Sequence, residues 1–216
     1  MRIALIFCAT CLVTLCVGST TTNSAEPGDV RVTAASTTAQ RQAAERGLAA
    51  LQALVATAPN VGLGFAKPED VRRAKLETPL RVYLVRLDAL QAMNDRTPLS
   101  SLLLDARRTL YPVTVDGRVV SGLFAQENNG TWTVQQFGEA ALARTSDAHR
   151  RSVNDILVWI PAAKLYFVGS GTGNALTLTP LVNDPRFGFA VDQNMPARAV
   201  LERVAHAMAD YNGLPQ

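Results

Sequence analysis

All three cysteines of this 216-residue chain lie within its first sixteen residues, at Cys8, Cys11 and Cys16. They belong to an apolar run that follows the charge of Arg2 and precedes small and polar residues up to Ala25. This order is typical of a secretory signal peptide. A chain without residues 1–25 has no thiol, which excludes a cysteine nucleophile, a disulfide framework and a thiolate metal site. We therefore expect an apolar core to stabilise the fold.

The apolar run spans about 15 residues, Ile3–Val17, and a bilayer-spanning helix needs roughly 20. We predict cleavage near Ala25, a periplasmic or extracellular location, and no transmembrane span in the mature chain. A lipid anchor on Cys16 is the alternative. Leu15 stands where a bacterial lipoprotein signal has a small residue, which disfavours that alternative.

Charge and histidine content exclude two further classes of partner. Arg2 is the only charged residue in the first 25, so cleavage lowers the net charge from +3 to +2. Nucleic-acid binding needs a concentrated basic face, and the arginines here occur in short groups separated by acids, so we expect no such binding. With His149 and His206 as the only imidazoles, we expect no metal site and no cofactor.

The apolar pattern predicts a flexible leader over 26–36 and one domain over 37–216. Thr37 and Gln40 have the spacing of a helix capping box, and a stripe of apolar residues follows at helical spacing, at Ala44, Leu48, Leu51 and Val55. A second amphipathic helix begins after Pro196 and ends at Asn212–Gly213. Shorter helices are expected over 99–107 and 139–151.

The middle of the chain alternates with the period of β-strands. Strands are predicted over 80–85, 109–115, 119–126, 131–137, 156–168 and 175–182, with turns at Asp116–Gly117 and Asn128–Gly130. This order predicts an α+β fold, in which the N- and C-terminal helices pack on one face of a curved, mostly antiparallel sheet of about five to six strands. Pro112, Pro161 and Pro180 mark edges, bulges or bends, because proline cannot donate to a sheet ladder.

Two local patterns that suggest catalysis or phosphate binding have structural explanations. Ser146, Asp147 and His149 lie on one turn of a predicted helix, whereas a catalytic triad converges from separate parts of a fold. The loop Gly169–Gly173 is rich in glycine but runs from strand to strand, and a phosphate-binding loop leads into a helix. We assign no catalytic residue.

The segment Asp184–Phe189 is the strongest candidate for a binding site. Arg186 stands beside two aromatic residues, Phe187 and Phe189, and exposed aromatics next to arginine are typical of recognition surfaces. The alternative is that the two rings close over the core. We add Tyr111, where Pro112 distorts a strand, and Trp159 to the candidate residues for ligand or partner binding.

These observations predict an exported, non-enzymatic module that binds a protein or a small molecule. One alternative is a cell-envelope hydrolase using carboxylates or serine, because such sites assemble in three dimensions without a local signature. Another is an assembly or folding helper that binds a partner strand at an open sheet edge.

Overall fold

A computed structural model describes residues 38–58 and 63–210. The predicted signal peptide, the three cysteines, the leader and the Thr37 half of the capping box lie outside the described residues. Gln40 is described, and its amide donates a hydrogen bond to the Thr109 hydroxyl. Among the described residues, no helix is both long and apolar enough to cross a bilayer.

The described strands form one mixed sheet in the order β5-β4-β3-β2-β6-β7-β8-β9, and β1 pairs with β3 beside this path. Every pairing is antiparallel except β2 with β6. The strands are β1 (Lys75–Leu76), β2 (Leu80–Leu84), β3 (Leu104–Val115), β4 (Arg118–Asn128), β5 (Thr131–Gly138), β6 (Ile156–Ile160), β7 (Leu165–Ser170), β8 (Thr177–Pro180) and β9 (Met195–Pro196). The α+β class is confirmed, with more strands than expected.

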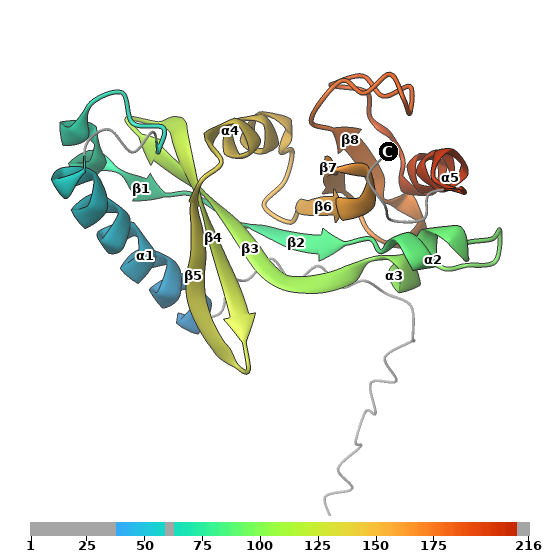
Figure 1. Cartoon of the computed structure of the whole chain (residues 1–216), viewed down its shortest axis with the longest axis horizontal. Helices are drawn as coiled ribbons and strands as arrows, with labels where there is room; N and C mark the ends of the chain where they lie inside the picture. The colour runs from blue at the N-terminus through green and yellow to red at the C-terminus, as the bar shows by residue number, and fades with distance from the viewer. Residues whose placement is uncertain (1–37, 59–62, 211–216) are drawn as a thin grey trace, which may run out of the picture.

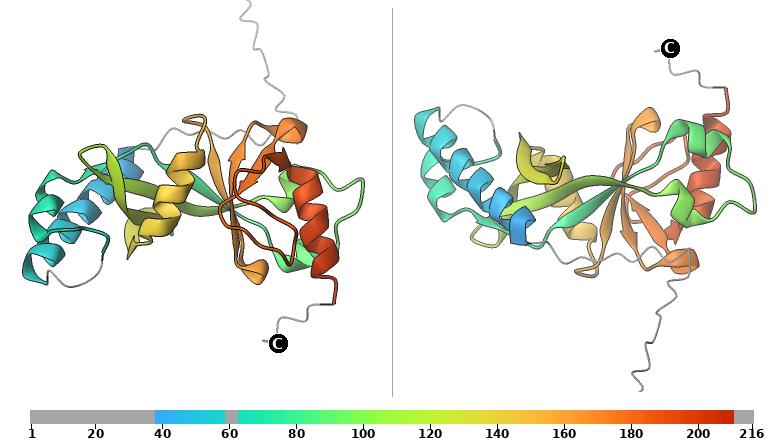
Figure 2. Two further views of the ribbon diagram at one scale, coloured as in Figure 1. Left: turned by 90° about the horizontal axis from the view of Figure 1, so that it is seen from above. Right: turned by 90° about the horizontal axis from the view of Figure 1, so that it is seen from below.

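Helices cover the sheet at both ends and in the middle (Figure 1). The α-helices are α1 (Thr38–Thr57), α2 (Leu87–Gln91), α3 (Leu99–Leu102), α4 (Ala140–His149) and α5 (Ala197–Ala207), and the 3₁₀ turns are η1 (Pro68–Arg73), η2 (Pro161–Ala163) and η3 (Gly173–Ala175). Figure 2 shows an elongated molecule, with α1 at one end, α5 at the other and α4 between them.

The strand register shows which helices share a face, because directly paired residues point the same way. On one face, Leu80, Leu110 and Phe124 pack in a cluster with Leu142 of α4. The other face buries two clusters. One holds Tyr111, Leu123 and Ala125 beneath Ala44 of α1, and the other holds Tyr83, Val158 and Phe167 beneath Val200 and Val204 of α5. The N- and C-terminal helices therefore pack on the same face, as predicted, and α4 covers the opposite one.

Expected elements differ from the structure in three places. The C-terminal helix, α5, ends at Ala207, and its expected end at Asn212–Gly213 lies outside the described residues. The predicted strand over 156–168 is two strands, because η2 and a left-handed Lys164 reverse the chain between β6 and β7. The helix expected over 99–107 ends at Leu102, and β3 begins at Leu104 because it pairs with β2 there.

The three strand prolines occupy positions that need no amide donor. Pro112 lies in the interior of β3, where the neighbour changes from β2 to β1. Its carbonyl accepts a hydrogen bond from the amide of Glu77, in the link between β1 and β2. The ring nitrogen of Pro112 points the same way as this carbonyl, toward the link, where no strand needs a donor. Pro161 begins the η2 turn and Pro180 ends β8.

Candidate interaction surface

The aromatic pair of the 184–189 segment lies in the core. Phe187 and Phe189 are 5% and 3% exposed. The Phe189 ring meets Phe167 of β7 edge to face, at 5.4 Å between centroids, and stacks on Phe187 at 5.8 Å. The two rings therefore close over the core and do not form an exposed recognition surface.

Arginine side chains hold this segment in place. Arg186 donates through Nη2 to Asp184 Oδ2 at 2.6 Å, and through Nε to Oδ1 at 3.0 Å. These hydrogen bonds hold the pKa of Asp184 below its usual value. Arg203 of α5 donates to the Gly188 carbonyl and lies over the Phe189 ring. Arg186 is exposed, but its guanidinium is already engaged within the segment.

The other two candidate residues lie elsewhere. Tyr111 is fully buried on β3, on the face covered by α1. Trp159 is half-buried on β6, on the α4 face, and stacks on Tyr166 of β7 with ring centroids 5.8 Å apart. The structure therefore brings Arg186, Phe187 and Phe189 together, and leaves Tyr111 and Trp159 apart from them and from each other.

A polar and aromatic cluster surrounds Arg108 on the α4 face. Its guanidinium lies 3.8 Å from the Phe124 ring centroid and donates to Gln136 Oε1 at 2.7 Å, and Gln136 donates to Glu139 at 2.8 Å. Burial lowers the pKa of Arg108 and raises that of Tyr166, and the charge of Arg108 opposes the rise in the Tyr166 pKa. The cluster couples β3, β5 and β7 beneath the start of α4.

The histidine identified in the sequence makes structural contacts. His149 Nδ1 lies 2.7 Å from the Thr145 carbonyl oxygen, and Nε2 lies 2.6 Å from Asp192 Oδ1. Both ring nitrogens are thus engaged without a serine hydroxyl. Within residues 38–58 and 63–210, no three histidine, cysteine or acidic side chains gather in a way that would hold a metal ion.

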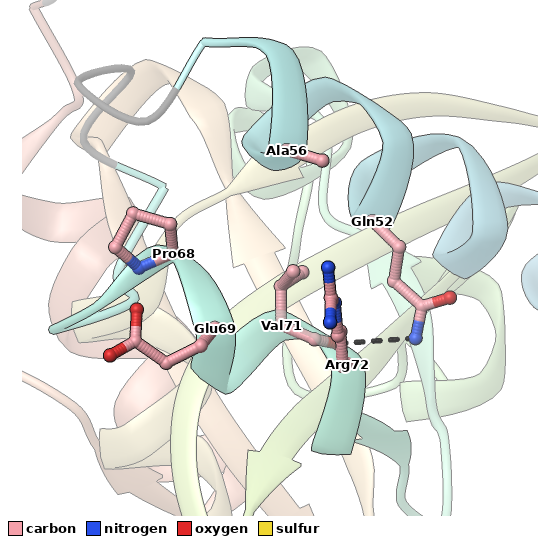
Figure 3. A pocket seen from close by; sticks show the side chains of 6 residues that line it. All are labelled: Gln52, Ala56, Pro68, Glu69, Val71 and Arg72. Carbon is pink, nitrogen blue, oxygen red and sulfur yellow. Dashed lines mark hydrogen bonds between the residues drawn. The ribbon is translucent and has the colours of Figure 1, made fainter.

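A shallow hollow of about 660 Å³ lies between α1 and η1 (Figure 3). Gln52 of α1 donates to the Val71 carbonyl of η1 at 3.1 Å, which ties the two walls together. Glu69 and Arg72 supply opposite charges to the lining, with Ala56 and Pro68 as apolar neighbours. The hollow presents no convergent set of groups for one ligand.

The two ends of the sheet differ in how they are protected. At one end β9 has two residues and includes Pro196, and short edge strands with proline resist pairing with another chain. At the other end β5 has eight residues, Thr131–Gly138, without charge or proline. In the described part of the chain β5 pairs with β4 alone. A bulge opposite Phe124 and Ala125 interrupts that pairing near Gln135.

The turn that joins β4 and β5 determines which backbone groups of β5 point outward. Positive φ at Asn129 and Gly130, 50° and 79°, forms a two-residue turn. Asn128 and Thr131 flank it as a hydrogen-bonded pair, and hydrogen-bonded pairs then alternate along the ladder. Trp132 and Val134 consequently direct both their N–H and C=O groups away from β4. Figure 1 shows the tip of this hairpin extending beyond the helices.

Side chains on β5 alternate between the two faces of the sheet. Thr131, Thr133 and Gln135 are exposed, whereas Trp132 and Val134 are half-buried beside the α1 cluster. Sequence reasoning predicted this strand but missed its place at the edge of the sheet that the described residues form. The signal available in the sequence was a strand lacking lysine, glutamate and proline.

Comparison of the chain with protein families, curated proteins and solved structures finds no match.

Proposed function

We propose that this protein is an exported interaction module that binds an extended polypeptide segment by strand addition at β5. The observation that carries the proposal is the eight-residue, uncharged edge with the backbone groups of Trp132 and Val134 directed outward. Main-chain hydrogen bonds supply affinity in strand addition, and alternate side chains supply specificity. The proposal unites the binding module and the strand-pairing helper expected from the sequence.

Export rests on residues 1–25, whose charge, apolar run and small residues have the order of a cleaved signal. We infer a periplasmic or extracellular location. Fractionation of the source cells, with N-terminal sequencing of the isolated protein, tests this. A start near residue 26 supports it, and a cytoplasmic protein that begins at Met1 contradicts it.

Amide exchange at β5 tests strand addition directly. The probe is a soluble peptide of alternating threonine and valine with a lysine at each end. The control peptide has proline at its centre, which removes a donor from the ladder. We expect the first peptide to slow exchange at the amides of Trp132 and Val134 and the control to leave it unchanged. In a Trp159→Phe variant, emission from Trp132 reports the same event.

Two results would contradict the proposal. One is that the Trp132 and Val134 amides are already protected in the free monomer, which would mean that β5 is covered. The other is that the alternating peptide protects neither amide at any concentration while the protein remains folded.

A further inference from the structure

We propose that a second copy of this chain is a partner of the β5 edge, and that the two copies join through antiparallel β5 strands related by a two-fold axis at Thr133. The inference rests on the proposed function, because both need an open β5. It goes further than the proposed function by stating which chain pairs with β5 and which residues of the two strands face each other.

The register follows from which groups of β5 face outward. In an antiparallel ladder, hydrogen-bonded pairs form between residues whose N–H and C=O groups both point at the other strand. Trp132 of one copy therefore pairs with Val134 of the second, and the reverse pair forms across the axis. Thr133 then faces Thr133 of the second copy as the closer, non-hydrogen-bonded pair. The bulge near Gln135 limits the regular pairing to this short span.

The side chains are compatible with this register. Trp132 and Val134 lie on the α1 face, where an aromatic residue and a β-branched residue form a favourable cross-strand pair. Thr133 lies on the opposite, exposed face, and threonine pairs well with threonine. The paired residues of β5 carry no charge, so the strand pairing itself buries no charged group.

The neighbouring helix is the second, independent observation. From Gly47 to Thr57, α1 carries no charged residue, although Ala50, Ala53 and Leu54 are exposed there; the exposed Arg46 lies one turn before Ala50 on the same side of the helix. Gln52 binds η1 on one flank of the helix. Leu54 lies about 200° around the helix from Gln52 and only about 20° from Gly47, given 100° per residue. Because Gly47 faces Val134 of β5, Leu54 lies on the flank toward β5.

Pairing of two β5 strands brings the α1 helices of the two copies together on one face of the joined sheet. Small side chains allow helices to approach closely. The exposed alanines and Leu54 of α1 are then part of the surface that becomes covered, with Arg46 beside them.

The test uses the full chain expressed with its signal peptide, residues 1–25, and purified after export. We expect the molar mass from light scattering to rise from monomer to dimer with concentration, and the Trp132 and Val134 amides to gain protection over the same range. Thr133→Lys places two like charges at the closest pair, so we expect the dimer dissociation constant to rise at least about tenfold. Thr172→Lys makes the same change at an exposed loop position and should leave the dimer dissociation constant unchanged.

Charge reversal separates pairing from misfolding. Thr133→Glu should also be monomeric, whereas an equimolar mixture of the Thr133→Lys and Thr133→Glu proteins should form mixed dimers. A wild-type protein that stays monomeric at every soluble concentration overturns the inference, as does a Thr133→Lys protein that dimerises like wild type. If the alternating peptide still protects Trp132 and Val134 in such a monomer, self-pairing is wrong and strand addition stands. If the peptide protects neither amide, self-pairing and strand addition are both wrong.

Discussion

The close approach of α1 to the sheet makes Gly47→Ala a sensitive probe of the fold. A methyl group at position 47 would overlap Cγ2 of Val134 in β5 and lie 3.0 Å from Cδ1 of Leu123 in β4. Overpacking of this kind costs about 1–3 kcal/mol, and alanine gains about 1 kcal/mol over glycine in a helix interior. We therefore expect a net loss of about 1 kcal/mol in the free energy of unfolding.

A second substitution isolates the contact. Val134→Ala removes the methyl group that collides, so the double variant should be more stable than the sum of the single effects by about 1–2 kcal/mol. Ala49→Gly, on the exposed side of α1, measures the helix-propensity difference alone, at about 1 kcal/mol.

Urea unfolding gives each free energy from the midpoint and slope, and the melting temperature should move by about 2–4 °C per kcal/mol for a chain of this size. If Gly47→Ala is more stable than wild type and shows no coupling to Val134→Ala, then α1 does not lie against β5 as described.

Two further predictions address the 184–189 segment. Phe189→Ala should lower the free energy of unfolding by about 3–4 kcal/mol, because its buried ring fills space against Phe167; a loss below about 1 kcal/mol in urea unfolding would contradict its place in the core. Asp184→Asn should cost about 1 kcal/mol at pH 7, a figure reduced for the exposure of Arg186. Because folding holds the pKa of Asp184 below its unfolded value, this stabilisation is present above the unfolded pKa and is lost as the pH falls through the folded pKa. The difference in the free energy of unfolding between wild type and Asp184→Asn should therefore disappear in acid. A difference that persists when urea unfolding is repeated at low pH would refute the assignment.

Sequence patterns predicted the elements whose stability is local. The stripe after Pro196 matches α5, and the two Asx-Gly turns define the β3–β4 and β4–β5 hairpins. The alternation in β2 predicted a strand with one buried face, but Val82 and Tyr83 are both buried because this central strand is covered on both faces, by the cluster beneath α4 and by the cluster beneath α5. No local pattern distinguishes such a central strand from a half-exposed one.

The candidate surface was harder to predict for the same reason. Whether β5 is an edge depends on which strands lie beside it, and that is decided by pairing between distant segments. Short strands such as β1 and β9 gave no periodic signal, since two residues form no period. The phenylalanines of the 184–189 segment attracted attention as aromatics beside arginine, and their burial depends on β7 and α5, which the segment itself does not encode.

The parallel pairing of β2 with β6 also constrains the order in which the chain assembles. Arg81 meets Ile156 only after β3, β4, β5 and α4 have been synthesised between them. Bringing such distant segments together is entropically costly and slow compared with closing a hairpin. In a nascent or truncated chain that stops before Ile156, one side of β2 has no strand to pair with. In that interval the unfinished protein has, besides β5, a second exposed strand edge with which another chain could pair.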